Sequence, residues 1–141
     1  MDARDYIGKP RDTVREHELA RRLRELPTEE AHSFIVDYIA GDPVVGLILA
    51  NRVLRSNEHF REILKDGLEQ ADASTIKFWL ECCLPRLGPM GLVQTLIEAA
   101  ESNPAGAELT VYWLEFMLRG RTEPVKQESQ KLVKAVGRGT V

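Results

Sequence analysis

The amino-acid sequence predicts an all-α protein, built as a short right-handed superhelix of about four antiparallel helix pairs. Apolar residues recur at helical spacing along most of the chain, and the breaks between these runs are only a few residues long. In addition, Phe78-Trp79-Leu80-Glu81 returns 34 positions later as Tyr112-Trp113-Leu114-Glu115. Self-similarity at a period of roughly 20–50 residues is typical of stacked helical hairpins. A compact helical bundle is the alternative architecture.

The N-terminal region begins with a polar segment and continues into two helices. Residues 1–10 show no hydrophobic period, and we expect a flexible N-terminus there. Residues 11–26 carry a sparse apolar stripe, which predicts an outer helix. Thr28 can cap a helix over residues 29–39, whose apolar positions form a clear stripe.

The middle of the chain predicts four more helices. Pro43 suits the first turn of a helix over residues 43–55, which is apolar nearly all round and therefore belongs in the interior. An amphipathic run over residues 58–70 follows. Two further runs, over residues 76–87 and 89–102, are separated by Gly88-Pro89.

Two helices complete the predicted fold. Asn103-Pro104 is an N-cap followed by proline, and it predicts a helix over residues 104–117 that carries Leu109, Tyr112, Trp113, Phe116 and Met117. A last helix is expected over residues 123–136. We therefore predict one helical-repeat domain over residues 11–136 and a short tail over residues 137–141.

The pattern between residues 43 and 136 resembles the HEAT and armadillo class of α-solenoids. Three predicted helix pairs align at spacings of about 29 to 36 residues, and the first helix of each pair is the more apolar one. In that class, two helices form a layer and each layer buries its face on the next. The resemblance implies a stacked superhelix. Because these units are shorter than typical HEAT units, the compact bundle remains the alternative.

Bulk composition narrows the functional classes. The 141 residues are 43% hydrophobic and 29% charged, as in ordinary globular domains, and the formal net charge is −3. A globally basic nucleic-acid binder is therefore disfavoured. The longest apolar run is seven residues, residues 44–50, whereas a membrane span needs about 20. The charged start of the chain leads into no apolar segment, so we expect a cytoplasmic protein with no membrane span.

No enzyme signature is complete in this sequence. His17-Glu18-Leu19-Ala20-Arg21 begins like the zinc-peptidase motif H-E-x-x-H, but Arg21 stands where the second histidine is needed. The other histidines, His32 and His59, occur singly on polar helices. We therefore expect no enzyme activity, no catalytic residue, no metal site and no cofactor.

Two residue types admit both a packing role and a functional role. Cys82 and Cys83 are adjacent, which excludes a disulfide framework and favours reduced, buried thiols over a reactive nucleophile. Trp79 and Trp113 are expected to be buried between helix layers. The alternative for the tryptophans is an exposed platform on which a ligand stacks.

Charge is unevenly distributed, and the basic C-terminal end supplies the candidate binding residues. Residues 28–72 hold nine acids and four bases, whereas residues 119–141 hold six bases and two acids. On a helical wheel, the four bases of the last helix fall within an arc of roughly 140°. These bases could bind an acidic partner, or they could simply form the solvent-exposed face of a terminal capping helix. The candidate residues are Arg119, Arg121, Lys126, Lys131, Lys134 and Arg138.

These observations favour a non-enzymatic protein-interaction or scaffold module. Its expected partner is another protein or peptide, or a second copy in a homo-oligomer held by the acidic and basic stretches. The alternative is nucleic-acid or small-ligand binding on a HEAT-like scaffold through the basic C-terminal end. The sequence identifies neither the partner nor the binding face.

Overall fold

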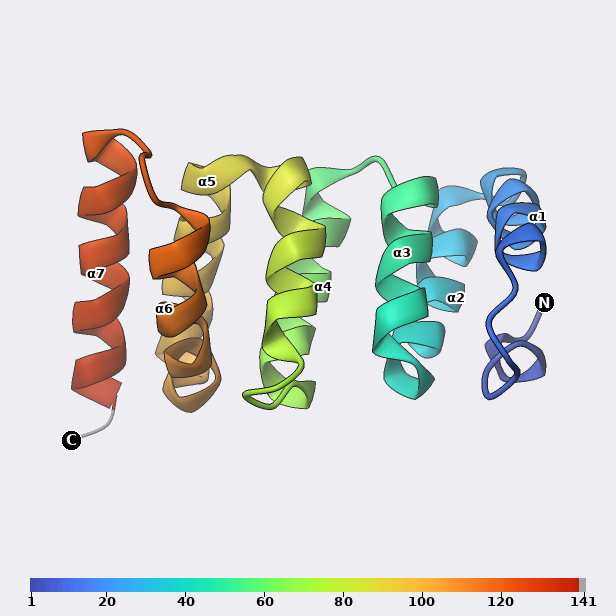
Figure 1. Ribbon diagram of the computed structural model, residues 1–141, viewed down its shortest axis with the longest axis horizontal. Helices are drawn as coiled ribbons and strands as arrows, with labels where there is room; N and C mark the ends of the chain where they lie inside the picture. Colours follow the sequence, from blue (N-terminus) through green and yellow to red (C-terminus); the bar gives the residue numbers. More distant parts are fainter. Residues whose placement is uncertain (140–141) are drawn as a thin grey trace. The chain divides into compact units, whose positions relative to one another are not determined.

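The structure is a computed structural model that describes the backbone of residues 1–139 and the side chains of residues 1–137. Over these residues it contains seven α-helices, one short 3-10 helix and no strand, so the predicted all-α fold is confirmed (Figure 1). None of the described helices is both long and apolar enough to cross a bilayer. The chain divides into two compact units, Met1–His59 and Phe60–Val141, with the boundary inside one helix.

The N-terminal unit holds three complete α-helices and the start of a fourth. α2 packs against α3, and α1 contacts both of these helices. The apolar stripe predicted for α2 is confirmed, because Phe34, Ile35, Tyr38 and Ile39 are all buried. The elements are η1 (Ala3–Asp5), α1 (Thr13–Arg24), α2 (Thr28–Gly41), α3 (Pro43–Val53) and the first residues of α4 (Asn57–Gln70).

The first ten residues, in which the sequence shows no period, contain the 3-10 helix η1. Tyr6, just after η1, meets Phe34 of α2 edge to face with ring centroids 6.0 Å apart, and it lies under the guanidinium group of Arg15. Arg11 Nε donates to the buried Glu16 Oε1 at 2.8 Å. Individual side-chain contacts thus join Tyr6 to α1 and α2, and the flexibility expected for residues 1–10 stays a prediction.

The C-terminal unit contains the rest of α4 and three further helices, α5 (Ile76–Ser102), α6 (Pro104–Met117) and α7 (Glu123–Gly139). α5 is interrupted at Gly88, which adopts φ 73° and ψ 165°. Only glycine adopts such a left-handed φ without strain, and the following Pro89 has no N–H to continue the ladder. The two helices predicted over residues 76–87 and 89–102 are thus the two segments of α5.

The start of α6 is tied to the end of α4 by one bifunctional side chain. Asn103 caps α6 by accepting a hydrogen bond from the Gly106 N–H at 3.0 Å. Its amide nitrogen donates to the Leu68 carbonyl at 3.1 Å. α6 then packs against both α5 and α7.

The indole ring of Trp79 lies directly against the backbone of α4 at Gly67. Trp79 is only 1% exposed, and a Cβ atom placed on Gly67 would overlap its ring. The sequence prediction that Trp79 is buried is confirmed. Gly67 is required because any side chain there would push the two helices apart.

We expect Gly67→Ala to lower the free energy of unfolding by about 1–3 kcal/mol, since overpacking a full interior forces shifts of side chains and backbone. Alanine favours a helix over glycine by about 1 kcal/mol, so helix propensity alone would make Gly67→Ala more stable, not less. Urea unfolding followed by circular dichroism measures the change. Gly137→Ala is the matched control, because no heavy atom lies within 4 Å of its added Cβ. Equal stability of the two variants would contradict the contact.

Candidate functional site

The structure separates the predicted basic residues instead of gathering them into one site. The side chains of Arg119, Arg121, Lys126, Lys131 and Lys134 are all exposed, whereas the side chain of Arg138 lies outside the described residues. Arg119 and Lys126 line a groove between α6 and α7. Lys131 and Lys134 line a different depression, together with Glu101 of α5. A helical wheel shows the direction of each side chain but not which neighbouring helix it faces.

Acids one turn away partly neutralise two of these lysines. Lys131 pairs with Glu128 at 2.7 Å, and Lys126 lies 3.7 Å from Glu123. Both are i, i+3 pairs on α7. Exposed pairs of this kind contribute only a few tenths of a kcal/mol, and the lysines are therefore easily redirected toward another anion.

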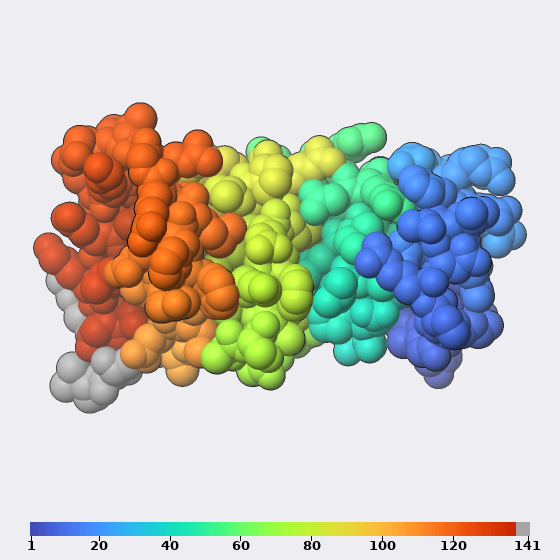
Figure 2. Space-filling model, viewed as in Figure 1, coloured from blue at the N-terminus to red at the C-terminus, as the bar shows by residue number. Residues whose placement is uncertain are grey.

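The groove between α6 and α7, which we name the α6–α7 groove, has a volume of about 400 Å³. Figure 2 shows these two helices next to each other on the face in view, coloured orange and red. Apolar side chains form most of the lining, and Val133 is 51% exposed. Arg119, Lys126 and Glu115 are the charged groups at its edge. The apolar lining residues are Val111, Leu114, Leu118, Val125, Leu132 and Val133.

Aromatic rings are exposed on the neighbouring face of α6, where the sequence predicted that Trp113 is buried. Tyr112 is 60% exposed and Phe116 is 46% exposed, while Trp113 is partly exposed and not buried as expected. The prediction for Trp113 was wrong because matching positions in two helices need not have matching neighbours. The repeat spacing places Trp113 on the same side of its helix as Trp79, but it does not specify which element packs on that side. Leu114, by contrast, is buried like its counterpart Leu80.

Tyr112, Trp113 and Phe116 form this exposed face, which we name the aromatic face. Their rings contact one another and lie beside two cations. Tyr112 meets both Trp113 and Phe116 edge to face, with ring centroids 5.3 and 5.0 Å apart. The Arg119 guanidinium lies 4.9 Å from the Phe116 ring centroid, and the Lys77 ammonium lies 5.6 Å from that of Trp113. Such cation–π contacts orient positive charge beside apolar surface.

The cysteines are buried and lie on the inner side of α5. Neither Cys82 nor Cys83 forms a disulfide. The neighbouring Cys82 thiol and burial together raise the pKa of the Cys83 thiol well above its ordinary value. Cys83 also contacts the Phe60 carbonyl, with a sulfur–oxygen distance of 3.6 Å. This surrounding favours the neutral thiol, as the packing interpretation of the sequence expected.

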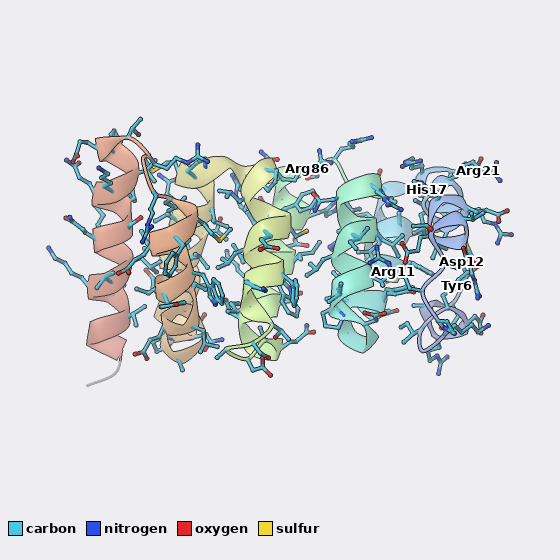
Figure 3. The ribbon with its side chains drawn as sticks, viewed as in Figure 1. Tyr6, Arg11, Asp12, His17, Arg21 and Arg86 are labelled. Atoms are coloured by element: carbon cyan, nitrogen blue, oxygen red, sulfur yellow. The ribbon has the colours of Figure 1, made fainter. Side chains whose placement is uncertain are left out.

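The histidines depart from the expectation that they are scattered singly. His32 and His59 stack in the N-terminal unit with ring centroids 4.1 Å apart and planes 14° apart. Glu29 accepts a hydrogen bond from His59, with 3.0 Å between Oε1 and Nε2. The Glu29–x–x–His32 spacing is the only sequence signal for this cluster. The third histidine, His17, stays apart on the exposed side of α1 (Figure 3).

Comparison with known protein families, with curated proteins and with solved structures finds no match for this chain. The resemblance to HEAT and armadillo repeats therefore stays a prediction. The function has to be inferred from the geometry of the groove, the aromatic face and the histidine cluster.

Exposure of the aromatic face leads to a direct test of which aromatic residues stabilise the fold. We expect Tyr112→Ala and Phe116→Ala to change the free energy of unfolding by less than about 1 kcal/mol. Trp79→Ala removes a fully buried indole and is expected to cost about 3–5 kcal/mol. Denaturant titration of the three variants measures these values. A loss at Tyr112 as large as at Trp79 would show that the ring is buried.

The buried, protonated state of Cys83 predicts slow chemical modification. We expect both cysteines of the folded protein to react with iodoacetamide at pH 7.5 at least about 100-fold more slowly than in 6 M urea, because the thiolate is the reacting form. Mass spectrometry of quenched samples follows the reaction. Rapid alkylation of either thiol without unfolding would contradict the packing role.

Proposed function

We propose that the protein is a non-enzymatic interaction module that binds an acidic amphipathic helix of a partner protein in the α6–α7 groove. The observation that carries the proposal is the groove itself, an apolar channel between two helices with exposed cations at its edge. An amphipathic helix laid into a groove of this kind is one of the recurring modes of peptide recognition.

The lining supports a helix as the occupant. Two neighbouring helices offer parallel ridges of side chains, and a third helix can set its own ridges between them. Val133 is half exposed on α7, and Val111 of α6 is also part of the lining. Covering these apolar side chains removes them from water, which contributes roughly 25 cal/mol per Å² of apolar surface buried.

Charge at the edge of the groove supports an acidic occupant. Arg119, Arg121 and Lys126 are exposed where α6 ends and α7 begins, and Glu115 is the single acid among the described lining residues. Carboxylates on an incoming helix would meet more cations than anions there. Complementary charge of this kind raises the association rate and selects the partner's orientation.

The aromatic face extends the proposed surface beyond the groove. Tyr112 and Phe116 lie on the same helix as the groove residues Val111 and Glu115, one position further along in each case. Aromatic residues and arginine are enriched in protein interfaces because they bury much area at low entropic cost. A partner wider than one helix would therefore also cover this face.

We also propose that the helix pairs are repeats of the HEAT and armadillo class, forming a short right-handed superhelix. The two matching four-residue segments, 78–81 and 112–115, which we call the two tetrads, support this idea. Leu80 and Leu114 are both buried, while Glu81 and Glu115 are both exposed. Boundary chemistry also repeats, because Asp42-Pro43 and Asn103-Pro104 each cap a helix and supply proline to its first turn.

Val133→Arg tests the proposed groove. A random 16-residue peptide library displayed on phage is selected against the protein, and the recovered peptides are measured by fluorescence anisotropy. We expect acidic peptides with apolar residues at i, i+3, i+4 and i+7, and at least tenfold weaker binding to Val133→Arg. Val14→Arg is the matched control, because Val14 is 76% exposed on α1 of the other unit.

Three outcomes would overturn this function. Peptides that bind Val133→Arg as tightly as the parent protein do not use the groove. Salt-dependent binding of single-stranded oligo(dT), lost in Tyr112→Ala and Phe116→Ala, would instead assign the aromatic face to nucleic acid. Concentration-dependent dimerisation in the ultracentrifuge, abolished by Val133→Arg, would make a second copy the occupant.

A further inference from the structure

We propose that Glu29, His32 and His59 form a binding site for a divalent transition-metal ion of the zinc class. We name these three residues the histidine cluster. It lies wholly within the N-terminal unit, and its donor atoms, one from each residue, all lie within 4.8 Å of one another. The proposal is independent of the α6–α7 groove, which lies in the C-terminal unit.

Local helix geometry brings the three side chains together. Glu29 and His32 are three residues apart in the first two turns of α2, and residues at that spacing share a helix face. His59 is the third residue of α4. The start of one helix thus supplies a carboxylate and an imidazole, and the start of another supplies the second imidazole.

One donor–donor distance in the cluster is close to that of a metal-bound set, and all donor atoms lie within 4.8 Å of one another. In a tetrahedral site with metal–ligand bonds of about 2.0–2.1 Å, ligand atoms lie roughly 3.3 Å from one another. Glu29 Oε1 and His59 Nε2 are already 3.0 Å apart. The stacked rings must turn, because each nitrogen lone pair lies in its ring plane, and rotation about the Cβ–Cγ bond of histidine is soft.

His59 is buried beside the carboxylate of Glu29, which accepts a hydrogen bond from its Nε2 atom. The residue is 7% exposed, and its Nδ1 atom is buried without a hydrogen-bond partner. A neutral imidazole that donates from Nε2 to Glu29 carries its lone pair on Nδ1. An ion bound at Nε2 would take the place of the proton that Nε2 donates to Glu29, and the ring proton would then be carried on Nδ1.

The donor set and its exposure define the class of ion. Two imidazoles and one carboxylate suit zinc, nickel, copper and iron, whereas magnesium and calcium prefer oxygen ligands throughout. The Glu29 side chain is 83% exposed, so an ion can enter from solvent and keep water in its remaining positions. Such an ion would link the first turn of α2 to the first turn of α4.

Titration with Zn²⁺ at pH 7.5, followed by isothermal calorimetry, tests the site. We expect one equivalent to bind with at least 100-fold preference over Mg²⁺, and Co²⁺ to give visible d–d absorption from nitrogen and oxygen ligands. Binding should weaken at acidic pH, because only neutral imidazole binds a metal. His32→Gln and Glu29→Gln should each weaken Zn²⁺ binding at least tenfold.

Matched variants separate the cluster from other donors. His17→Gln removes the remaining histidine, which is exposed on α1, and is expected to leave Zn²⁺ binding unchanged. Glu29→Gln keeps an oxygen that can accept from His59 while it removes the carboxylate charge. Because His59 is buried and its substitution can disturb folding, the test of the site depends on His32→Gln and Glu29→Gln.

The proposal is overturned if Zn²⁺ binds no more tightly than Mg²⁺. It is equally overturned if His17→Gln weakens binding as much as His32→Gln, or if Cys82→Ser with Cys83→Ser abolishes it. Loss of peptide binding in Val133→Arg leaves this site unaffected, so failure of the proposed function and failure of the metal site are distinguishable.

Discussion

The contact of Trp79 with the backbone at Gly67 is the constraint on which the C-terminal unit depends. It sets the first segment of α5 against α4, and the Asn103–Leu68 hydrogen bond then places the start of α6 against the same helix. The break at Gly88 lets the second segment of α5 run back through the unit, where α5 contacts both α6 and α7. The α6–α7 groove is thus positioned by a glycine and an indole that do not line it.

The two tetrads show which structural features sequence periodicity can predict and which it cannot. Trp79 and Trp113 occupy matching places in the repeat, but Trp79 is buried against the α4 backbone at Gly67, whereas Trp113 is partly exposed. Spacing correctly predicted the helices, the Asn103 cap, the break at Gly88 and the buried leucines, because these follow from local chemistry. The predicted Thr28 cap was wrong, since Thr28 is the first residue of α2 and its N-cap is Pro27, which forms no side-chain cap hydrogen bond. Whether a given face is covered depends on which neighbour packs there, and a repeat of four residues carries no information about that neighbour.

The candidate sites were harder to predict for the same reason. The wheel of α7 placed Lys126 and Lys131 on one broad face, yet they line different depressions because α6 and α5 approach α7 from different directions. The histidine cluster joins residues 27 positions apart, and neither histidine has a motif around it. Glu29 and His32 share a helix face by spacing alone, but only the packing of α2 beside the start of α4 adds His59.

Charge and apolar surface play different parts in the proposed groove. Lys126 already has Glu123 one turn away, and Arg119 lies over the Phe116 ring, so neither cation is held by a buried partner. Exchanging Glu123 for a carboxylate on an incoming helix therefore changes the free energy little, since exposed pairs contribute about 0–1 kcal/mol. Affinity must come mainly from covering Val133 and the neighbouring apolar lining. The cations then determine how fast, and in which direction, an acidic helix enters.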